Sequence, residues 1–156
     1  MKLFLQKLAA TLYGMVIRVR NTLFDKDILK GVEFNIPIVC IGNITAGGTG
    51  KTPMVELMVS HFSKSRNVAV LSRGYKRKTK GYKVVDTFDN YTDVGDEPLQ
   101  IKRKFPHIPV IVCENRVAGI NRIRQEFKDV NLIIMDDGFQ HRWVKPYLNI
   151  VMIDYT

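Results

Sequence analysis

The chain has 156 residues, enough for one domain with a substantial hydrophobic core. Hydrophobic residues make up 46% of it and charged residues 25%, which excludes a disordered chain and one that lies within a membrane throughout. The formal net charge of +9 indicates an acidic partner, such as nucleic acid, a phosphorylated small molecule or an anionic membrane surface. Cys40 and Cys113 lie in apolar runs without a C-x-x-C motif, so we expect buried free thiols.

An apolar stripe at spacings of three and four predicts an amphipathic helix over residues 3–24, carried by Leu5, Leu8, Leu12, Val16, Val19 and Leu23. Lys7 and Arg18 interrupt the apolar character, which argues against a membrane-spanning helix and a signal peptide. Basic flanks beside a broad apolar face favour a helix in the membrane interface, assigned to residues 1–24. A helix that packs on its own domain remains the alternative.

Residues 38–53 form the most informative stretch of the chain. A β-branched apolar run is followed by a glycine-rich turn and then by a helix-forming segment, which is the setting of a phosphate-binding loop. Glycines let backbone N–H groups surround phosphate oxygens, Lys51 can reach the outer phosphates, and the Thr52 hydroxyl can bind Mg²⁺. The pattern G-x-x-x-x-G-K-S/T is matched except at its first glycine, where Thr45 stands. The predicted nucleotide-binding residues are Thr45, Ala46, Gly47, Gly48, Thr49, Gly50, Lys51 and Thr52.

Further apolar runs alternate with helix-forming segments along the rest of the chain. Strands are predicted at 68–71, 110–113, 132–135 and 148–153, and the alternating residues 82–85 suggest a small hairpin arm. Helices are expected to end near 63, 104 and 128. The fold class is therefore α/β over residues 36–156: a mostly parallel sheet of the P-loop type flanked by helices, preceded by the N-terminal amphipathic helix. The order of the strands cannot be read from this pattern.

Polar residues follow two of the predicted strands. The basic run 73–80 leaves the C-terminal end of one strand, which is where parallel α/β sheets bind ligands, although such a run can also be a solvated loop. Asp136 and Asp137 follow the apolar run 132–135. A phosphate-loop enzyme uses an aspartate at the end of a neighbouring strand to hold Mg²⁺, so Asp136 is the second anchor of the predicted site.

Five motifs together resemble the tetraacyldisaccharide 4'-kinase family, the lipid A kinases of bacteria with an outer membrane. They stand in the family's order, and Thr45 is at home in that family. The motifs are the phosphate loop from Gly42 to Pro53, Ser72-Arg73-Gly74-Tyr75, Gly95-Asp96-Glu97-Pro98, Glu114-Asn115-Arg116 and Asp136-Asp137-Gly138-Phe139-Gln140-His141.

The resemblance implies ATP- and Mg²⁺-dependent phosphorylation of the 4'-hydroxyl of a tetraacylated glucosamine disaccharide 1-phosphate in lipid A biosynthesis. It implies a peripheral enzyme at the cytoplasmic face of the inner membrane, with a lipid substrate, an anionic membrane surface and no nucleic acid as partners. By resemblance, Lys51 and Thr52 serve the ATP phosphates and the metal, and Asp136 holds the metal with Asp137 beside it at the reaction centre. Asp96 resembles the general base. Substrate contacts would come from Arg73, Tyr75, Arg116, Gln140 and His141.

Members of that family carry a second half, which this chain does not cover, so the chain resembles an N-terminal half. We therefore expect weak nucleotide binding and little or no turnover from these residues alone. Two other readings remain: a P-loop kinase of another small-molecule acceptor, and a non-enzymatic basic module that binds membrane or nucleic acid. A GTPase would need an Asn-Lys-x-Asp motif, which the sequence lacks, and a membrane-partitioning ATPase would carry lysine in place of Ala46.

Overall fold

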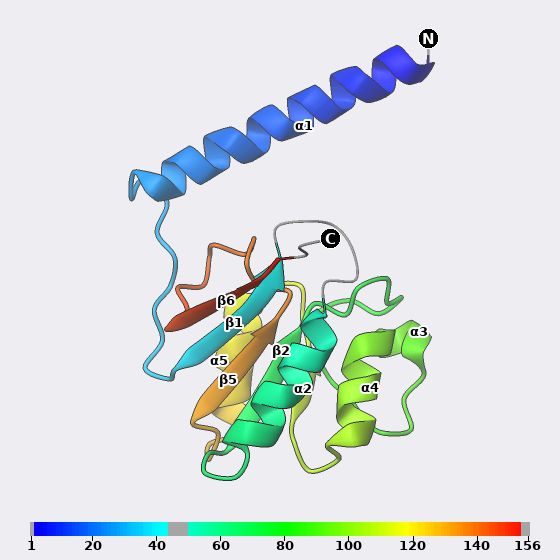
Figure 1. The fold of residues 1–156 in the computed structure, drawn as a ribbon, viewed down its shortest axis with the longest axis vertical. Coiled ribbons are helices and arrows are strands. Elements are labelled where there is room, and N and C mark those ends of the chain that lie inside the picture. The colour runs from blue at the N-terminus through cyan, green and yellow to red at the C-terminus, as the bar shows by residue number, and fades with distance from the viewer. Residues whose placement is uncertain (1, 44–49, 154–156) are drawn as a thin grey trace. The chain divides into compact units, whose positions relative to one another are not determined.

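The computed structural model describes residues 2–43 and 50–153, without the side chains of residues 2–10, 12 and 13. The chain divides into two compact units, residues 1–31 and residues 32–156. The first unit is built on one long helix, α1 (Lys2–Asp25), as the apolar spacing predicts (Figure 1). No helix in the described part of the chain combines the length and the apolar character that crossing a bilayer requires.

The second unit is an α/β domain whose described strands form one six-stranded sheet in the order β3-β4-β2-β5-β1-β6. Five of these strands are parallel, and β3 runs antiparallel to β4. The hairpin arm expected at 82–85 is therefore wrong: Lys83 and Val84 pair with the open edge of β4 instead. The elements are β1 (Ile38–Asn43), α2 (Lys51–Phe62), β2 (Val68–Ser72), β3 (Lys83–Val84), α3 (Tyr91–Val94), α4 (Asp96–Lys104), β4 (Val110–Val112), α5 (Arg116–Glu126), β5 (Leu132–Asp136) and β6 (Leu148–Met152).

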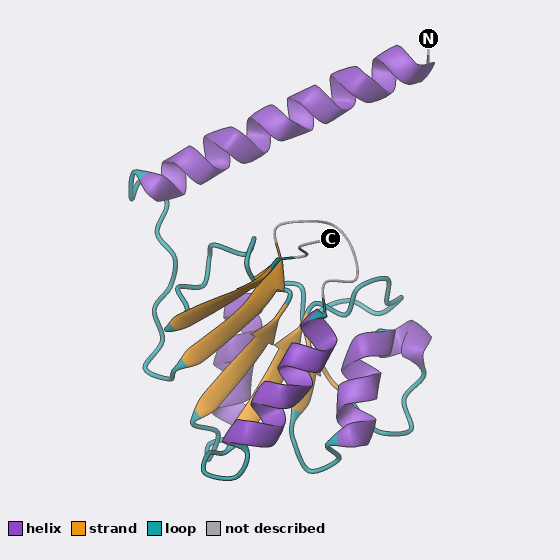
Figure 2. Ribbon diagram, in the orientation of Figure 1, coloured by secondary structure: helices purple, strands orange, loops and turns teal. Residues whose placement is uncertain are grey.

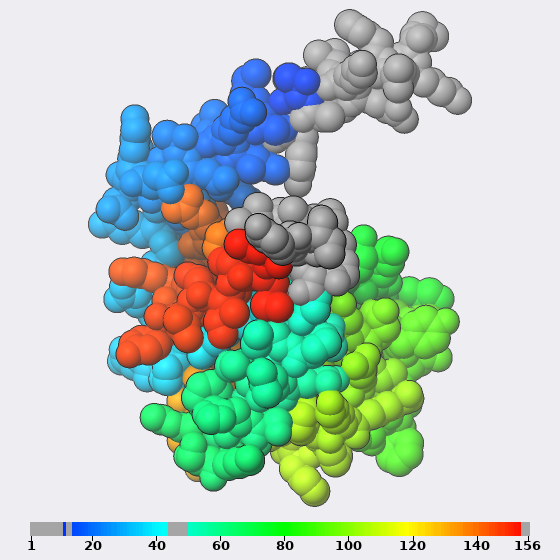
Figure 3. Space-filling view, viewed as in Figure 1, coloured from blue at the N-terminus to red at the C-terminus, as the bar shows by residue number. Residues whose placement is uncertain are grey.

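Helices cover both faces of the sheet, which explains why the central strands are apolar up to their C-terminal ends. Alternate residues of each strand point to opposite faces, so Ile134 packs in one core with Val55 of α2, and Ile133 packs in the other with Ile120 of α5. Figure 2 shows α2 and α4 in front of the strands and α5 behind them. In the space-filling view, side chains of α2 and α4 lie next to each other on the face turned to the viewer (Figure 3). Cys40 and Cys113 are buried and free, as expected.

The topology gathers polar residues at one edge of the sheet. β2 and β5 are parallel neighbours, and so are β5 and β1, so their C-terminal ends lie side by side. α2 follows β1 through the phosphate-loop segment, and Gly50 precedes it with a φ of 76°, in the region that favours glycine. These chain ends build the site described next.

Candidate active site

Asp136 ends β5 and keeps only 1% of its surface exposed. Its Oδ2 accepts a hydrogen bond of 3.1 Å from Ser72 Oγ, at the end of the neighbouring strand β2. Its Oδ1 has no hydrogen-bond partner in the described part of the chain. A buried carboxylate oxygen without a donor is costly, and a bound cation would compensate for the missing partner. Asp136 therefore fits the metal-binding role predicted for it.

The pKa of Asp136 is raised from 3.8 to about 6, chiefly by burial. The negative charges of Glu97 and Asp137 contribute to this rise, whereas the hydrogen bond from Ser72 and the positive charge of Arg116 act against it. The carboxyl group is thus poorly stabilised as an anion by its protein surroundings. A divalent cation at Oδ1 would favour the charged form.

Lys51 is the first residue of α2 and approaches Asp137, with 3.7 Å between Nζ and Oδ1. The Lys51 side chain is 15% exposed and that of Asp137 is 50% exposed, so the pair adds little to stability. Asp137 has a φ of 49°, which is unusual outside glycine and marks a tight turn after β5. Gly138 N closes that turn with a hydrogen bond of 3.2 Å to Ile41 O of β1. The turn thereby places a carboxylate beside the lysine of the phosphate-loop helix.

Glu97, in the first turn of α4, faces the same place. The Thr52 side chain lies beside its carboxylate and acts to lower the pKa of Glu97, so the first turns of α2 and α4 meet here. Burial raises the pKa of Glu97, and the charges of Asp96 and Asp137 raise it further, while Lys51 acts in the opposite direction. Lysine, threonine and three carboxylates thus converge where nucleotide phosphates and a cation would meet. Among the described residues no cluster of three His, Cys, Asp or Glu side chains could hold a metal unaided, and Mg²⁺ sites in such enzymes rely on substrate phosphates as well.

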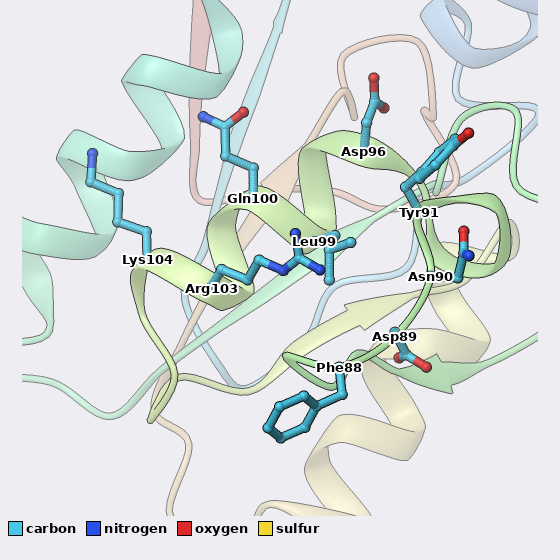
Figure 4. Close-up of a pocket in the computed structure, with 9 residues that line it drawn as sticks. All are labelled: Phe88, Asp89, Asn90, Tyr91, Asp96, Leu99, Gln100, Arg103 and Lys104. Carbon is cyan, nitrogen blue, oxygen red and sulfur yellow. The ribbon is translucent and has the colours of Figure 1, made fainter.

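Asp96 stands at the start of α4, is exposed, and accepts a hydrogen bond of 3.0 Å from Glu97 N through Oδ1. It lines one end of a groove of about 870 Å³ that runs along α4. Figure 4 shows Asp96, Gln100 and Lys104 on successive turns of that helix, with the segment 88–91 forming the opposite side. Asp96 is thus accessible to a ligand, as a general base must be.

The residues predicted to contact substrate lie in different surroundings. Arg73 and Gln140 are exposed, and His141 is half-buried. Tyr75 is 65% exposed, with Lys76 Nζ 5.2 Å from the centre of its ring. Contact of these four side chains with a substrate stays a prediction.

Arg116 has a different position from the one expected of a substrate-binding residue. It is 2% exposed, and its Nη1 donates a hydrogen bond of 2.7 Å to Cys113 O. Its Nη2 donates one of 3.4 Å to Asp136 O. This guanidinium connects the ends of β4 and β5 from inside the protein. Direct contact between Arg116 and a substrate therefore requires the side chain to leave these partners.

Ser72 and Glu97 belong to the site but were not predicted as site residues. Ser72 could have been recognised because it is the polar residue at the end of an otherwise apolar strand. Glu97 resembles an ordinary acidic residue in a first helical turn, so the sequence does not distinguish it from a residue that only stabilises the helix. The predicted nucleotide-binding residues Thr45, Ala46, Gly47, Gly48 and Thr49 lie outside the described residues.

A parallel sheet, a helix that begins with Lys-Thr behind a glycine, and a buried aspartate on the adjacent strand define the class of phosphate-loop α/β proteins. Within this class, the chain belongs to the tetraacyldisaccharide-1-P 4'-kinase family (LpxK), whose family model matches residues 1–156. The resemblance drawn from the five motifs is confirmed.

Individual relatives agree with the family match. A tetraacyldisaccharide 4'-kinase of Porphyromonas gingivalis is 53% identical over 149 residues, which cover 94% of this chain and 42% of the relative. One of Flavobacterium johnsoniae is 42% identical over 146 residues, covering 94% of this chain and 43% of that protein. A crystal structure of LpxK from Aquifex aeolicus in complex with ATP superposes with a TM-score of 0.82 at 37% identity, covering 90% of this chain and 45% of that one. The chain spans less than half the length of these relatives.

Proposed function

We propose that this chain supplies the nucleotide-binding half of an ATP-dependent kinase that phosphorylates the 4'-hydroxyl of a tetraacylated glucosamine disaccharide 1-phosphate in lipid A biosynthesis. The observation that carries the proposal is the convergence of Lys51, Thr52 and Asp136 at one sheet edge, in a chain of the tetraacyldisaccharide-1-P 4'-kinase family. Phosphoryl transfer needs positioned cations at the phosphates and an acceptor-side carboxylate more than it needs covalent chemistry.

The residues take the following roles in this proposal. Lys51 neutralises charge on the outer phosphates of ATP, and its neighbour Asp137 keeps its ammonium group at the reaction centre. Asp96 accepts the proton of the attacking hydroxyl, which its exposure beside the groove allows. Glu97 lies beside the Thr52 side chain, where the helix of the general base meets the helix of the phosphate loop.

Magnesium belongs to the same proposal. Asp136 Oδ1 and the Thr52 hydroxyl would hold it, and when bound it would neutralise charge on the transferred phosphate. The unsatisfied buried oxygen of Asp136 supports this choice of ligand.

A peripheral position at the cytoplasmic face of the inner membrane is proposed on the strength of α1. Met15 is 56% exposed, Val16 66% and Val19 56%, and together with Arg20 and Leu23 they line an apolar groove along the helix. Exposed apolar side chains flanked by basic residues suit the boundary between headgroups and acyl chains. An acylated acceptor would be reached at that boundary.

Phosphate transfer from labelled Mg-ATP to a tetraacylated disaccharide monophosphate in mixed micelles tests the proposal. We would compare the 156-residue chain, a chain extended to the length of the curated relatives, and extended chains carrying Asp96→Asn or Asp93→Asn. The extended chain should transfer phosphate, Asp96→Asn should lower kcat by a factor of about 100 to 10,000, and Asp93→Asn, on the adjacent α3, should behave like the unaltered chain. ATP binding without transfer to this acceptor would move the chain to another kinase class.

A further inference from the structure

The basic segment that follows β2 is organised around Arg77, whose side chain is only 2% exposed. Its Nη2 lies 2.8 Å from Glu114 Oε1 and also donates a hydrogen bond to Gly81 O. Its Nη1 donates one of 3.3 Å to Thr79 Oγ1. Glu114 Oε2 completes the ring by accepting a hydrogen bond of 2.9 Å from Gly81 N. Arg77 is therefore an internal cross-link, although it lies in a run of cationic residues that would suit a solvated loop.

The cross-link extends to a glycine that contacts Arg77 directly. Arg77 N donates a hydrogen bond of 3.2 Å to Gly74 O, and Gly74 has a φ of 68°. A Cβ atom at Gly74 would lie 2.5 Å from Arg77 Cδ and 3.0 Å from Val94 O of α3. Gly74 is thus held between the arginine and the end of α3, at a position that only a residue without a side chain can occupy.

The same segment contacts the start of α4. A Cβ atom at Gly95 would lie 3.3 Å from Gly74 Cα, and Gly95 has a φ of 93°. Lys78 N donates a hydrogen bond of 2.7 Å to Thr92 O, and Thr79 Oγ1 donates one to Asp93 O. Gly95 immediately precedes Asp96 and serves as the N-cap of α4. Segment 73–81 therefore contacts the residues that lead into Asp96, from Thr92 to Gly95.

We infer that Arg77 is a positioning residue for Asp96: its ion pair with Glu114 fixes segment 73–81 against Gly95 and so sets where the Asp96 carboxylate stands. Arg77 itself is buried behind the segment and does not touch a ligand. Glu114 directly follows β4, so the ion pair fixes the position of Asp96 relative to the sheet. The same sheet carries Asp136 at the end of β5. The catalytic consequence rests on the proposed function, whereas the mechanical one does not.

Hydrogen exchange of backbone amides in the 156-residue chain tests the mechanical part. Arg77→Met removes the charge and keeps much of the side-chain volume, and Arg124→Met, at an exposed arginine of α5, is the matched control. Amides of residues 91–97 should exchange at least about tenfold faster in Arg77→Met and at the unaltered rate in Arg124→Met. Exchange at 91–97 should be intermediate in Arg77→Lys, because lysine keeps one bond to Glu114 and loses the other donors of the planar guanidinium. Unaltered exchange at 91–97 in Arg77→Met would overturn the inference.

Turnover of the extended chain tests the catalytic part. Arg77→Met should lower kcat by about tenfold to a hundredfold at an unchanged KM for ATP, because Asp96 is misplaced while Lys51 and Asp136 are not. A raised KM for ATP at unchanged kcat would overturn the positioning role. If the unaltered extended chain transfers no phosphate, the proposed function fails, and the exchange experiment still decides whether Arg77 holds the start of α4.

Discussion

Replacing Asp136 by asparagine should make the metal-free chain more stable at neutral pH, although it removes a predicted metal ligand. The pKa of Asp136 is raised from 3.8 to about 6, chiefly by burial. One pKa unit corresponds to about 1.4 kcal/mol, so the charged group costs the folded state about 3 kcal/mol at pH 7. Because the folded state binds the proton more tightly than the unfolded state, this cost develops as the pH rises from about 4 to about 6.

The gain from Asp136→Asn will be smaller than that cost. Asparagine can still accept the hydrogen bond from Ser72, but its amide would stand where Oδ1 has no partner, which costs about 1 kcal/mol or more. We therefore expect the variant to be more stable than the unaltered chain by about 2 kcal/mol at pH 7 and to lose this advantage at pH 4.

Urea unfolding in EDTA at pH 4, 5, 6 and 7 measures the difference between the two chains. Asp129→Asn, at an exposed carboxylate, is the matched control and should follow the unaltered chain at every pH. Mg²⁺ should then stabilise the unaltered chain and leave Asp136→Asn unaffected. A stability difference between Asp136→Asn and the unaltered chain that stays constant from pH 4 to pH 7 would refute the reasoning.

Two further substitutions probe the framework of the site. Gly138→Ala places a Cβ atom 2.6 Å from Met135 Cε and 2.8 Å from Cys40 Sγ, so overpacking should lower the free energy of unfolding by about 1–3 kcal/mol in urea titrations; an unaltered midpoint would contradict the packing described. Asn115 is the N-cap of α5, and its side chain accepts a hydrogen bond of 3.1 Å from Ala118 N. Asn115→Ala removes this cap and should lower the stability by about 1 kcal/mol in thermal unfolding, whereas Asn115→Asp should keep the chain near its original Tm.

The strands were predictable because each central one is buried on both faces and is therefore apolar up to its C-terminal end, as β1 and β5 are. Their order was not, since nothing local records that β5 separates β1 from β2. β3 was misassigned for the same reason: the alternation around Lys83 suits a hairpin as well as an edge strand, and the long-range pairing with β4 decides between them.

The site divides in a similar way. Lys51, Thr52 and Asp136 could be predicted as candidates because phosphate and metal binding impose fixed residue types at fixed places after a strand. Arg116 was predicted to contact substrate and Arg77 was read only within the basic run 73–80, because a cationic side chain gives no sign of burial until its carbonyl or carboxylate partners are brought to it. Those partners come from elements distant in sequence.

The position of β5 in the sheet has a consequence for how the chain folds during synthesis. β1 and β2 are made first, yet each pairs with β5, so that Ile38 meets Ile133 and Val68 meets Leu132. Until residues 132–136 have left the ribosome, β1 has neither of its described sheet neighbours, β5 and β6. The nascent chain therefore keeps the apolar strand β1 unpaired until β5 has been made, and the described sheet closes when β5 enters between β1 and β2.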